Sequence, residues 1–189
     1  MKFLNCMTII NIIISIIFLY FTFKLAFKIS KKYELNYSII FFIISWHTFI
    51  SIFYFFISFE KRSDALKYFK YTFLGQLGEY NQVKFFEFRI GTNAVYEFIR
   101  FITSNFYLDY LNLFILFNSF GAIGLVLIYI KCLEVLKYTK LNYFLLFSII
   151  FLPSMSFWSS APGKDALSFL IVGLYLFSFN KKYYYIFIP

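Results

Sequence analysis

The uncharged stretch FLNCMTIINIIISIIFLYFTF, from Phe3 to Phe23, is the strongest fold signal in this chain, since its 21 residues contain no charged side chain. A helix of that length rises about 30 Å, which matches the hydrocarbon thickness of a bilayer. The stretch is too long for the apolar region of a cleaved signal peptide, and no small-residue cleavage site follows it. We therefore expect an uncleaved membrane-spanning helix here.

The composition extends this prediction to the whole chain. Its 189 residues are 61% hydrophobic and 14% charged, with a mean hydropathy of +0.74. These values lie outside the range of soluble globular domains, and a water-soluble fold of this size could not bury so much apolar surface in one core. We therefore expect an all-α fold, a multi-pass bundle of transmembrane helices.

Further apolar stretches predict the other spans. The second span is predicted at 35–59 and the third at 110–130. The fourth begins at 141 and ends between 153 and 158, the fifth ends at 179, and the start of a sixth lies at 183–189. The chain is thus expected to be a single transmembrane domain over 1–189, with about five spans and part of a sixth. We also expect it to be the front part of a longer protein.

Lysines predict the orientation of these spans. The segments 24–34, 131–140 and 180–182 are lysine-rich and alternate around the spans, so the positive-inside rule places them in the cytoplasm. The segment 60–109 has almost no charge bias and belongs on the outer side. Apolar residues recur within it at helical spacing and predict two amphipathic helices on the outer membrane surface: Leu66, Phe69 and Phe73 in the first, and Val95, Phe98, Ile99 and Ile102 in the second.

Histidine and cysteine are too scarce to predict a metal site or a disulfide framework. Cys6 and Cys132 have no partner at metal-ligand spacing, and His47 is the single histidine. The net charge of +9 falls in short loops between apolar segments, so nucleic acid is not an expected partner. We interpret His47 as a residue that contacts another helix rather than as part of a proton relay. Asn118, Gly121 and Gly124 are suited to close packing between helices.

Asp64 is the first candidate for chemistry. It follows the second span, where a carboxylate could face a substrate held at the lipid surface. It could act as a general base toward a sugar hydroxyl or hold a metal bound to a diphosphate. The alternative is that Asp64 complements the N-terminal dipole of the first amphipathic helix.

The second candidate is the run PSMSFWSSAPGKD at 153–165. The apolar stretch at 166–179 is only 14 residues, about 21 Å of helix against the roughly 30 Å needed. The fifth span is therefore expected to begin about six residues earlier, which draws Lys164 and Asp165 to the membrane boundary, where ionisable groups are usually paired or functional. Two prolines and several small residues also permit a broken helix that lines a polar pocket. A short solvated loop is the alternative.

Two strings resemble known families. RSDALKY at 62–68 resembles the outer loop of EpsG-like and Wzy-like bacterial polysaccharide polymerases, which often have Gly where this chain has Ser63. LPSMSFWSSAPGKD at 152–165 resembles a pattern in membrane proteins of surface-polysaccharide clusters, some of them similar to GT-C glycosyltransferases. The resemblance covers roughly residues 55–180.

The resemblance implies roles for five residues. Asp64 would be the catalytic acid of the outer loop, and substrate-binding roles would fall to four more: Lys164 and Asp165, which would face a phosphate, with Tyr68 and Arg62. The implied protein is a multi-pass enzyme of the plasma (inner) membrane that transfers or polymerises sugars from a polyprenyl-phosphate-linked donor. The alternatives are a transporter or flippase of a lipid-linked sugar, and a non-catalytic membrane subunit. No cofactor is identified.

Overall fold

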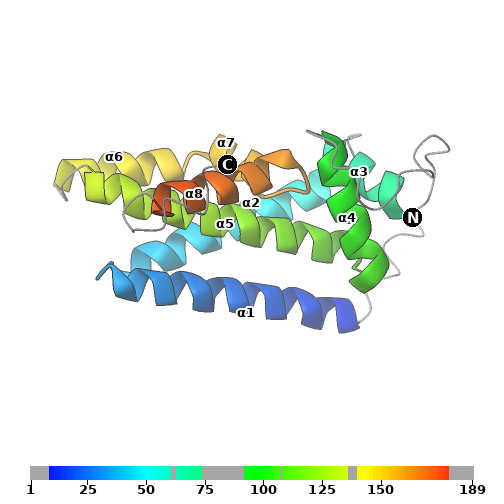
Figure 1. Cartoon of the computed structure of the whole chain (residues 1–189), viewed down its shortest axis with the longest axis horizontal. Helices are drawn as coiled ribbons and strands as arrows, with labels where there is room; N and C mark the ends of the chain where they lie inside the picture. The colour runs from blue at the N-terminus through cyan, green and yellow to red at the C-terminus, as the bar shows by residue number, and fades with distance from the viewer. Residues whose placement is uncertain (1–8, 61–62, 74–91, 107, 136–139, 179–189) are drawn as a thin grey trace.

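The computed structural model describes residues 9–60, 63–73, 92–106, 108–135 and 140–178, which form an all-α protein of eight helices (Figure 1). In chain order these are α1 (Ile9–Lys32), α2 (Tyr37–Glu60), α3 (Asp64–Phe73), α4 (Thr92–Phe106), α5 (Tyr110–Val135), α6 (Lys140–Ile150), α7 (Pro153–Ser159) and α8 (Lys164–Ser178). Among the described residues, three helical stretches are long and apolar enough to cross a membrane: Ile9–Lys32, Tyr37–Phe59 and Tyr110–Glu134. The prediction of a helical, multi-pass membrane protein is confirmed at this level.

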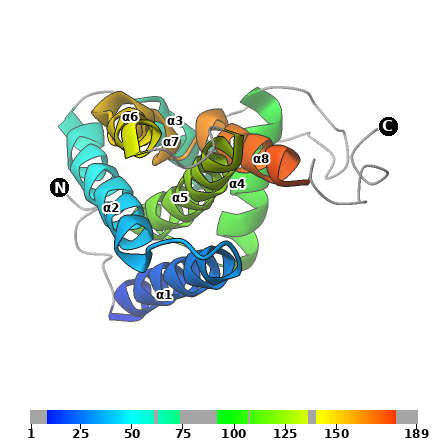
Figure 2. The ribbon, with the colours of Figure 1, turned by 90° about the vertical axis from the view of Figure 1, so that its left-hand side faces the viewer.

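Helix α5 forms the centre of the bundle. Figure 2 shows α1, α2, α6, α7 and α8 arranged around it, and α5 contacts all five. Of its apolar stretch 78% is buried, compared with 17% for α1. Helix α5 is therefore enclosed by its neighbours, and its polar residues Asn112, Asn118 and Ser119 are buried among them, whereas α1 is covered on one face only.

Helix α1 packs through small residues and exposes large ones. Its buried residues are Ser15, Thr22, Ala26 and Ser30, which allow the backbones to approach closely, as is typical of helix contacts in membranes. The opposite face exposes many aliphatic and aromatic side chains, among them Ile9, Ile13, Ile16, Ile17, Tyr20 and Phe21. A surface of this kind suits lipid and would be a liability in water.

The ends of the helices sort into two groups, as Figure 1 shows. The end of α1, the start of α2, the end of α5 and the start of α6 lie at one end of the bundle. Helices α3 and α4 lie at the opposite end, with the starts of α1 and α5. The arrangement agrees with the alternation of loops that the lysines predict.

The predicted fourth span is two helices, α6 and α7, joined by a break. Leu152 adopts an extended conformation (φ −58°, ψ 123°), and Pro153 opens α7. Proline disfavours a helical conformation in the preceding residue and suits the first turn of a new helix. The helix break that the prolines permit lies at this Leu-Pro step.

The predicted early start of the fifth span is wrong. Helix α8 begins at Lys164 rather than near residue 160, and residues 160–162 are buried in the turn that precedes it. One continuous helix would have to begin earlier than Lys164 to cross the membrane. The turn instead packs against other helices, so its backbone does not need to be helical to avoid lipid.

Glycines allow α8 to lie directly on α5. A Cβ atom on Gly124 would stand 2.5 Å from the backbone of Phe169 in α8. A Cβ atom on Gly121 would collide with the carbonyl oxygen of Ser159 at the end of α7. Both glycines therefore occupy close helix contacts, which is the packing role predicted for them.

Both predicted amphipathic helices exist, and they pack on the bundle end. The apolar faces of α3 and α4 join a buried cluster with residues of α2, α5 and the start of α8: Tyr54, Phe55, Ala65, Tyr68, Phe69, Val95, Ile99, Tyr110, Leu113, Phe114, Phe117, Ala161 and Ala166. The cluster fixes α3 against the turn that leads into α8. It thereby brings together the two stretches that the sequence singles out for chemistry.

Candidate functional site

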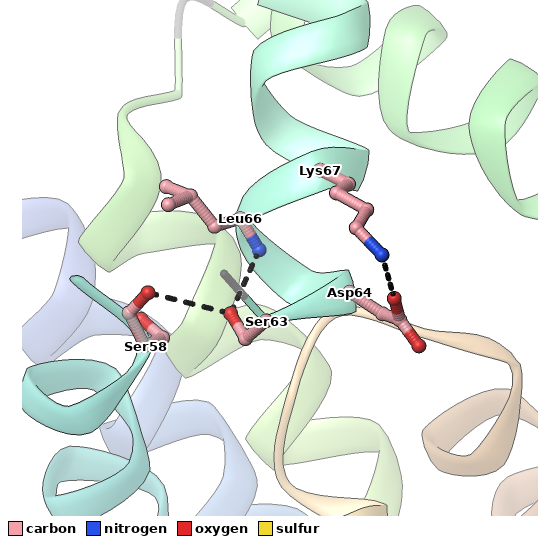
Figure 3. Close-up of polar contacts among 5 residues, drawn as sticks. All are labelled: Ser58, Ser63, Asp64, Leu66 and Lys67. Atoms are coloured by element: carbon pink, nitrogen blue, oxygen red, sulfur yellow. Dashed lines mark hydrogen bonds and ion pairs between the residues drawn. The ribbon is translucent and has the colours of Figure 1, made fainter. Parts of the chain in front are cut away.

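Helix α3 begins immediately beyond α2 because Ser63 caps it. The Leu66 amide donates a hydrogen bond to Ser63 Oγ at 3.2 Å, the usual N-cap geometry. The Ser63 hydroxyl in turn reaches the carbonyl oxygen of Ser58 in α2 at 3.5 Å (Figure 3). The cap therefore places Asp64 as the first residue of α3, one short step from the end of α2.

Asp64 is an open carboxylate. Its Oδ1 accepts a hydrogen bond from Lys67 Nζ at 2.8 Å, and the two side chains are 79% and 51% exposed, respectively. In Figure 3 the pair lies on the side of α3 away from Ser58. This position complements the helix dipole, as the alternative for Asp64 requires. It also leaves the carboxylate accessible to a substrate.

Tyr68 links Asp64 to the start of α8. Burial is the main cause that raises the pKa of the Tyr68 phenol, and the negative charges of Asp64 and Asp165 raise it further, whereas a hydrogen bond with Thr92 lowers it. The charges of two carboxylates from distant parts of the sequence therefore act on the same phenol. With its pKa raised from 10, the phenol stays protonated at neutral pH and can donate a hydrogen bond.

Lys164 and Asp165 occupy the first turn of α8. Lys164 is exposed and Asp165 is half-buried. The two side chains form no ion pair with each other in the described part of the chain, as expected for consecutive helical residues. The turn before them lies against α3, since a Cβ on Gly163 would be in ordinary contact with the Tyr68 ring at 3.9 Å.

We call the group Asp64, Lys67, Tyr68, Lys164 and Asp165 the α3–α8 site. It unites four of the five residues singled out from the sequence, and the fifth, Arg62, lies outside the described residues. No cluster of three His, Cys, Asp or Glu side chains among the described residues could hold a metal ion. The site offers two carboxylates that can accept protons, two lysines that can face an anion, and a phenol that can donate a hydrogen bond.

Comparison of the chain with protein-family models, with curated proteins and with solved structures finds no match. The geometry of the α3–α8 site and its surroundings therefore carries the functional argument.

A polar stripe along α2 was not predicted from the sequence. His47, Ser51, Tyr54 and Ser58 recur at helical spacing, and each is at most 7% exposed. These side chains contact other helices or the turn before α8. His47 forms hydrogen bonds with Asn118 and Ser159, and Ser51 donates to the carbonyl oxygen of Ser160. The Tyr54 ring stacks on Phe157, and Ser58 accepts a hydrogen bond from the Tyr110 hydroxyl. The signal was available, because polar residues at i, i+4, i+7 and i+11 of an apolar helix mark one face.

Proposed function

We propose that this chain belongs to a multi-pass enzyme of the plasma membrane that transfers or polymerises sugars from a polyprenyl-phosphate-linked donor in surface polysaccharide synthesis. The observation that supports it best is that Asp64 and Asp165 both act electrostatically on Tyr68, with Lys164 next to Asp165 in the first turn of α8. These residues come from stretches that resemble polysaccharide polymerases and related membrane proteins, and nothing in their spacing along the sequence requires them to meet. The proposal places their meeting point at the outer face.

The proposal includes a specific membrane arrangement. Helices α1, α2 and α5 are three spans, α6 with α7 forms a fourth, and α8 belongs to a fifth, within a single transmembrane domain over 1–189. Helices α3 and α4 lie at the outer boundary, where their polar faces meet water and headgroups. In this arrangement the α3–α8 site opens at the level where the phosphate of a lipid-linked sugar sits.

Each group of the site has a role in the proposed reaction. Asp64 accepts the proton of the acceptor sugar's hydroxyl as that oxygen attacks the anomeric carbon of the donor. Lys164, with the backbone amides of the first turn of α8, neutralises the departing phosphate or diphosphate. The Tyr68 phenol and Asp165 orient the sugar by hydrogen bonds, and Arg62 adds a second cation. The bond formed is the new glycosidic C–O bond, and the bond broken joins the anomeric carbon to the phosphate oxygen.

A transporter or flippase of the same lipid-linked sugar is the second candidate. The break between α6 and α7 and the buried polar residues of α2 favour it, since broken helices and interior polar groups line many transport sites. The two functions share a ligand and differ in whether a glycosidic bond is made.

Reconstitution separates the two functions. The full-length protein in proteoliposomes is supplied with a polyprenyl-diphosphate-linked oligosaccharide on one face. The enzyme predicts longer lipid-linked chains and released polyprenyl diphosphate, both visible by mass spectrometry. The transporter predicts unchanged chain length with donor appearing on the opposite face. Neither product nor movement, with the donor still intact, would reject both.

A further inference from the structure

His47 lies in the interior of the bundle and joins three helices. Its Nδ1 lies 2.6 Å from Asn118 Oδ1 in α5, and its Nε2 lies 2.9 Å from Ser159 Oγ at the end of α7. The His47 and Asn118 side chains and Ser159 are fully buried. The contact to Ser159 matters most, because Ser159 is the last residue of α7, directly before the turn that leads to Lys164.

The hydrogen-bond partners determine where the protons lie. An amide oxygen only accepts, so His47 Nδ1 must donate to Asn118 Oδ1. A neutral ring then has Nε2 as an acceptor, and the Ser159 hydroxyl is the donor within reach. A charged ring in the middle of an apolar bundle is costly to remove from water, which favours the neutral ring.

The Ser159 hydroxyl has one proton to donate and two acceptors within reach. Its Oγ also lies 2.6 Å from the carbonyl oxygen of Met155, one turn earlier in α7. A bond to Met155 would stay within α7, whereas a bond to His47 ties α7 to α2. If Nδ1 is the protonated nitrogen, the buried Nε2 has no hydrogen-bond partner unless Ser159 donates to it, and leaving it without one is costly, which favours the bond between helices.

Two further contacts fix the end of α7. Ser51, one turn beyond His47 on α2, donates to the carbonyl oxygen of Ser160 at 3.0 Å. Gly121 of α5 leaves space for the Ser159 carbonyl group, where any larger residue would collide with it. The end of α7 is therefore fixed from α2 and α5 at once, a few residues before the α3–α8 site.

We propose that His47 is a positioning residue: in its neutral Nδ1–H form its Nε2 accepts a hydrogen bond from the Ser159 hydroxyl, and this bond sets the position of Lys164 and Asp165 relative to α3. The consequence for the lipid-phosphate donor rests on the proposed function. The positional part does not, so the experiment measures position and activity separately.

The first measurement is the protonation state of the ring. His47 is the single histidine of these 189 residues, so this 189-residue chain, made with ¹⁵N-histidine and a purification tag that lacks histidine, gives one pair of imidazole signals. Solid-state NMR in lipid bilayers should show a neutral ring protonated at Nδ1. A ring protonated at Nε2 would mean that Ser159 gives its proton to Met155, and it would overturn the proposal.

The second measurement is the distance between α3 and α8. Spin labels on Lys67→Cys and Ser168→Cys, with Cys6 and Cys132 replaced by serine, report this distance by pulsed EPR in the full chain. We expect a narrow distribution that Ser159→Ala and His47→Leu shift or broaden and that His47→Gln, which keeps a donor and an acceptor, largely restores.

Ser119→Ala is the matched control. Ser119 is also a buried serine, but its hydroxyl donates to Ile115 within its own helix, so its loss should leave the distance unchanged. If His47→Leu does not accumulate in membranes, the comparison of Ser159→Ala with Ser119→Ala stands alone. Equal distributions in those two variants would overturn the positioning role.

Activity supplies the last readout, measured on the full chain with native residues at 67 and 168. Ser159→Ala should raise the KM for the polyprenyl-diphosphate donor about tenfold with little change in kcat, whereas Ser119→Ala changes neither. A shifted distance in a protein that shows no sugar transfer would reject the proposed function and leave the positioning role intact. A donor KM that stays at the wild-type value while the distance shifts would overturn the link between position and donor binding.

Discussion

Gly124 of α5 and Gly173 of α8 lie backbone to backbone. A Cβ atom on Gly173 would stand 2.7 Å from the carbonyl oxygen of Gly124 and 3.1 Å from its Cα. The contact brings the axes of the two helices together and lets α8 follow α5 closely. The contact therefore fixes α8, the helix that carries Lys164 and Asp165 in its first turn, against α5.

Alanine at Gly124 or Gly173 should destabilise the bundle. In a helix this change normally gains about 0.5–1 kcal/mol, but here the new methyl group meets backbone that cannot rotate away, and overpacking of this kind costs about 1–3 kcal/mol. We expect a net loss in the free energy of unfolding, measured by detergent titration in mixed micelles. Gly163→Ala is the control, because its Cβ would meet nothing closer than 3.9 Å. Equal stability of all three variants would contradict the close contact.

Much of the bundle could be predicted from the sequence, because lipid imposes strong constraints on it. The predicted second and third spans begin within two residues of α2 and α5, since uncharged stretches of this length have few alternatives. The Leu152–Pro153 break was also predictable in kind, from the backbone chemistry of proline. Residues 1–8 of the first predicted span lie outside the described residues.

The errors and omissions have one physical cause. Helix length alone predicts too early a start for α8, because the turn at 160–163 is stabilised by contacts with α2, α3 and α5. The meeting of Asp64 with Asp165 and the partners of His47 depend on the same tertiary contacts. Spacing along one chain segment cannot specify them.

Asp109 should make stability depend on pH. Its Oδ1 accepts the Asn112 amide at 2.7 Å and so caps α5, while burial, the largest cause, raises the pKa of its carboxyl despite hydrogen bonds from Asn112, Asn11 and Leu111. An acid whose folded-state pKa is raised binds its proton more tightly when folded. Its contribution to stability is therefore greatest at acidic pH and is lost as the pH rises through the folded pKa.

Two substitutions of Asp109 separate the cap from the charge. Asp109→Asn keeps the acceptor and removes the buried charge, so at neutral pH it should be at least as stable as wild type, with the advantage fading at acidic pH. Asp109→Ala removes the cap and should cost about 0.5–2 kcal/mol. Detergent titration at pH 4 to 8 measures both. The predicted direction of the pH dependence would be wrong if the wild-type protein became less stable as the pH falls from 7 to 5 while the Asn variant did not.

The membrane orientation predicts which cysteines react from outside the cell. In a background with Cys6 and Cys132 replaced by serine, Ser104→Cys on the exposed side of α4 should react with a membrane-impermeant maleimide in intact cells. Lys32→Cys at the end of α1 should react only after permeabilisation. The reverse pattern would place the α3–α8 site in the cytoplasm and would end the case for chemistry at the outer face.

Asp64 and its partner Lys67 can be tested against each other. If Asp64 is the proposed base, Asp64→Asn in the full-length protein should reduce polymer by at least about 100-fold, within the usual range for a general base, at an unchanged membrane level. Lys67→Met removes the exposed ion pair, worth about 0.2–1 kcal/mol, and leaves the carboxylate in place, so polymer should persist. If Asp64 only complements the dipole of α3, both variants would make normal polymer, and the catalytic role would be lost.

Lys164 and Asp165 provide the last test, because the structure gives them different surroundings. Lys164 is exposed at the start of α8, so Lys164→Ala should remove a cation from the donor phosphate without disturbing the fold. A charge-assisted hydrogen bond is worth about 1.5–3 kcal/mol, which corresponds to roughly a 10- to 100-fold rise in donor KM. Lys164→Arg should fall between wild type and alanine, since the charge remains but its geometry changes.

Asp165→Asn should act differently, because Asp165 is half-buried and its charge bears on Tyr68. We expect it to lower kcat as well as donor affinity, and the double variant with Lys164→Ala to recover activity only if the two charges merely balance each other. Ser168→Ala is the control, since the Ser168 hydroxyl donates to the Lys164 carbonyl oxygen within α8 and lies one turn beyond the site.

If residues 153–165 are instead a solvated loop, the results should be different. Cysteines at 164 and 165 would react freely with an impermeant thiol reagent even with donor bound, and none of the substitutions would change activity. Because Lys164 binds the donor phosphate and Asp165 orients the sugar in the proposed reaction, that result would remove the reason to prefer a lipid-phosphate enzyme over another kind of membrane protein.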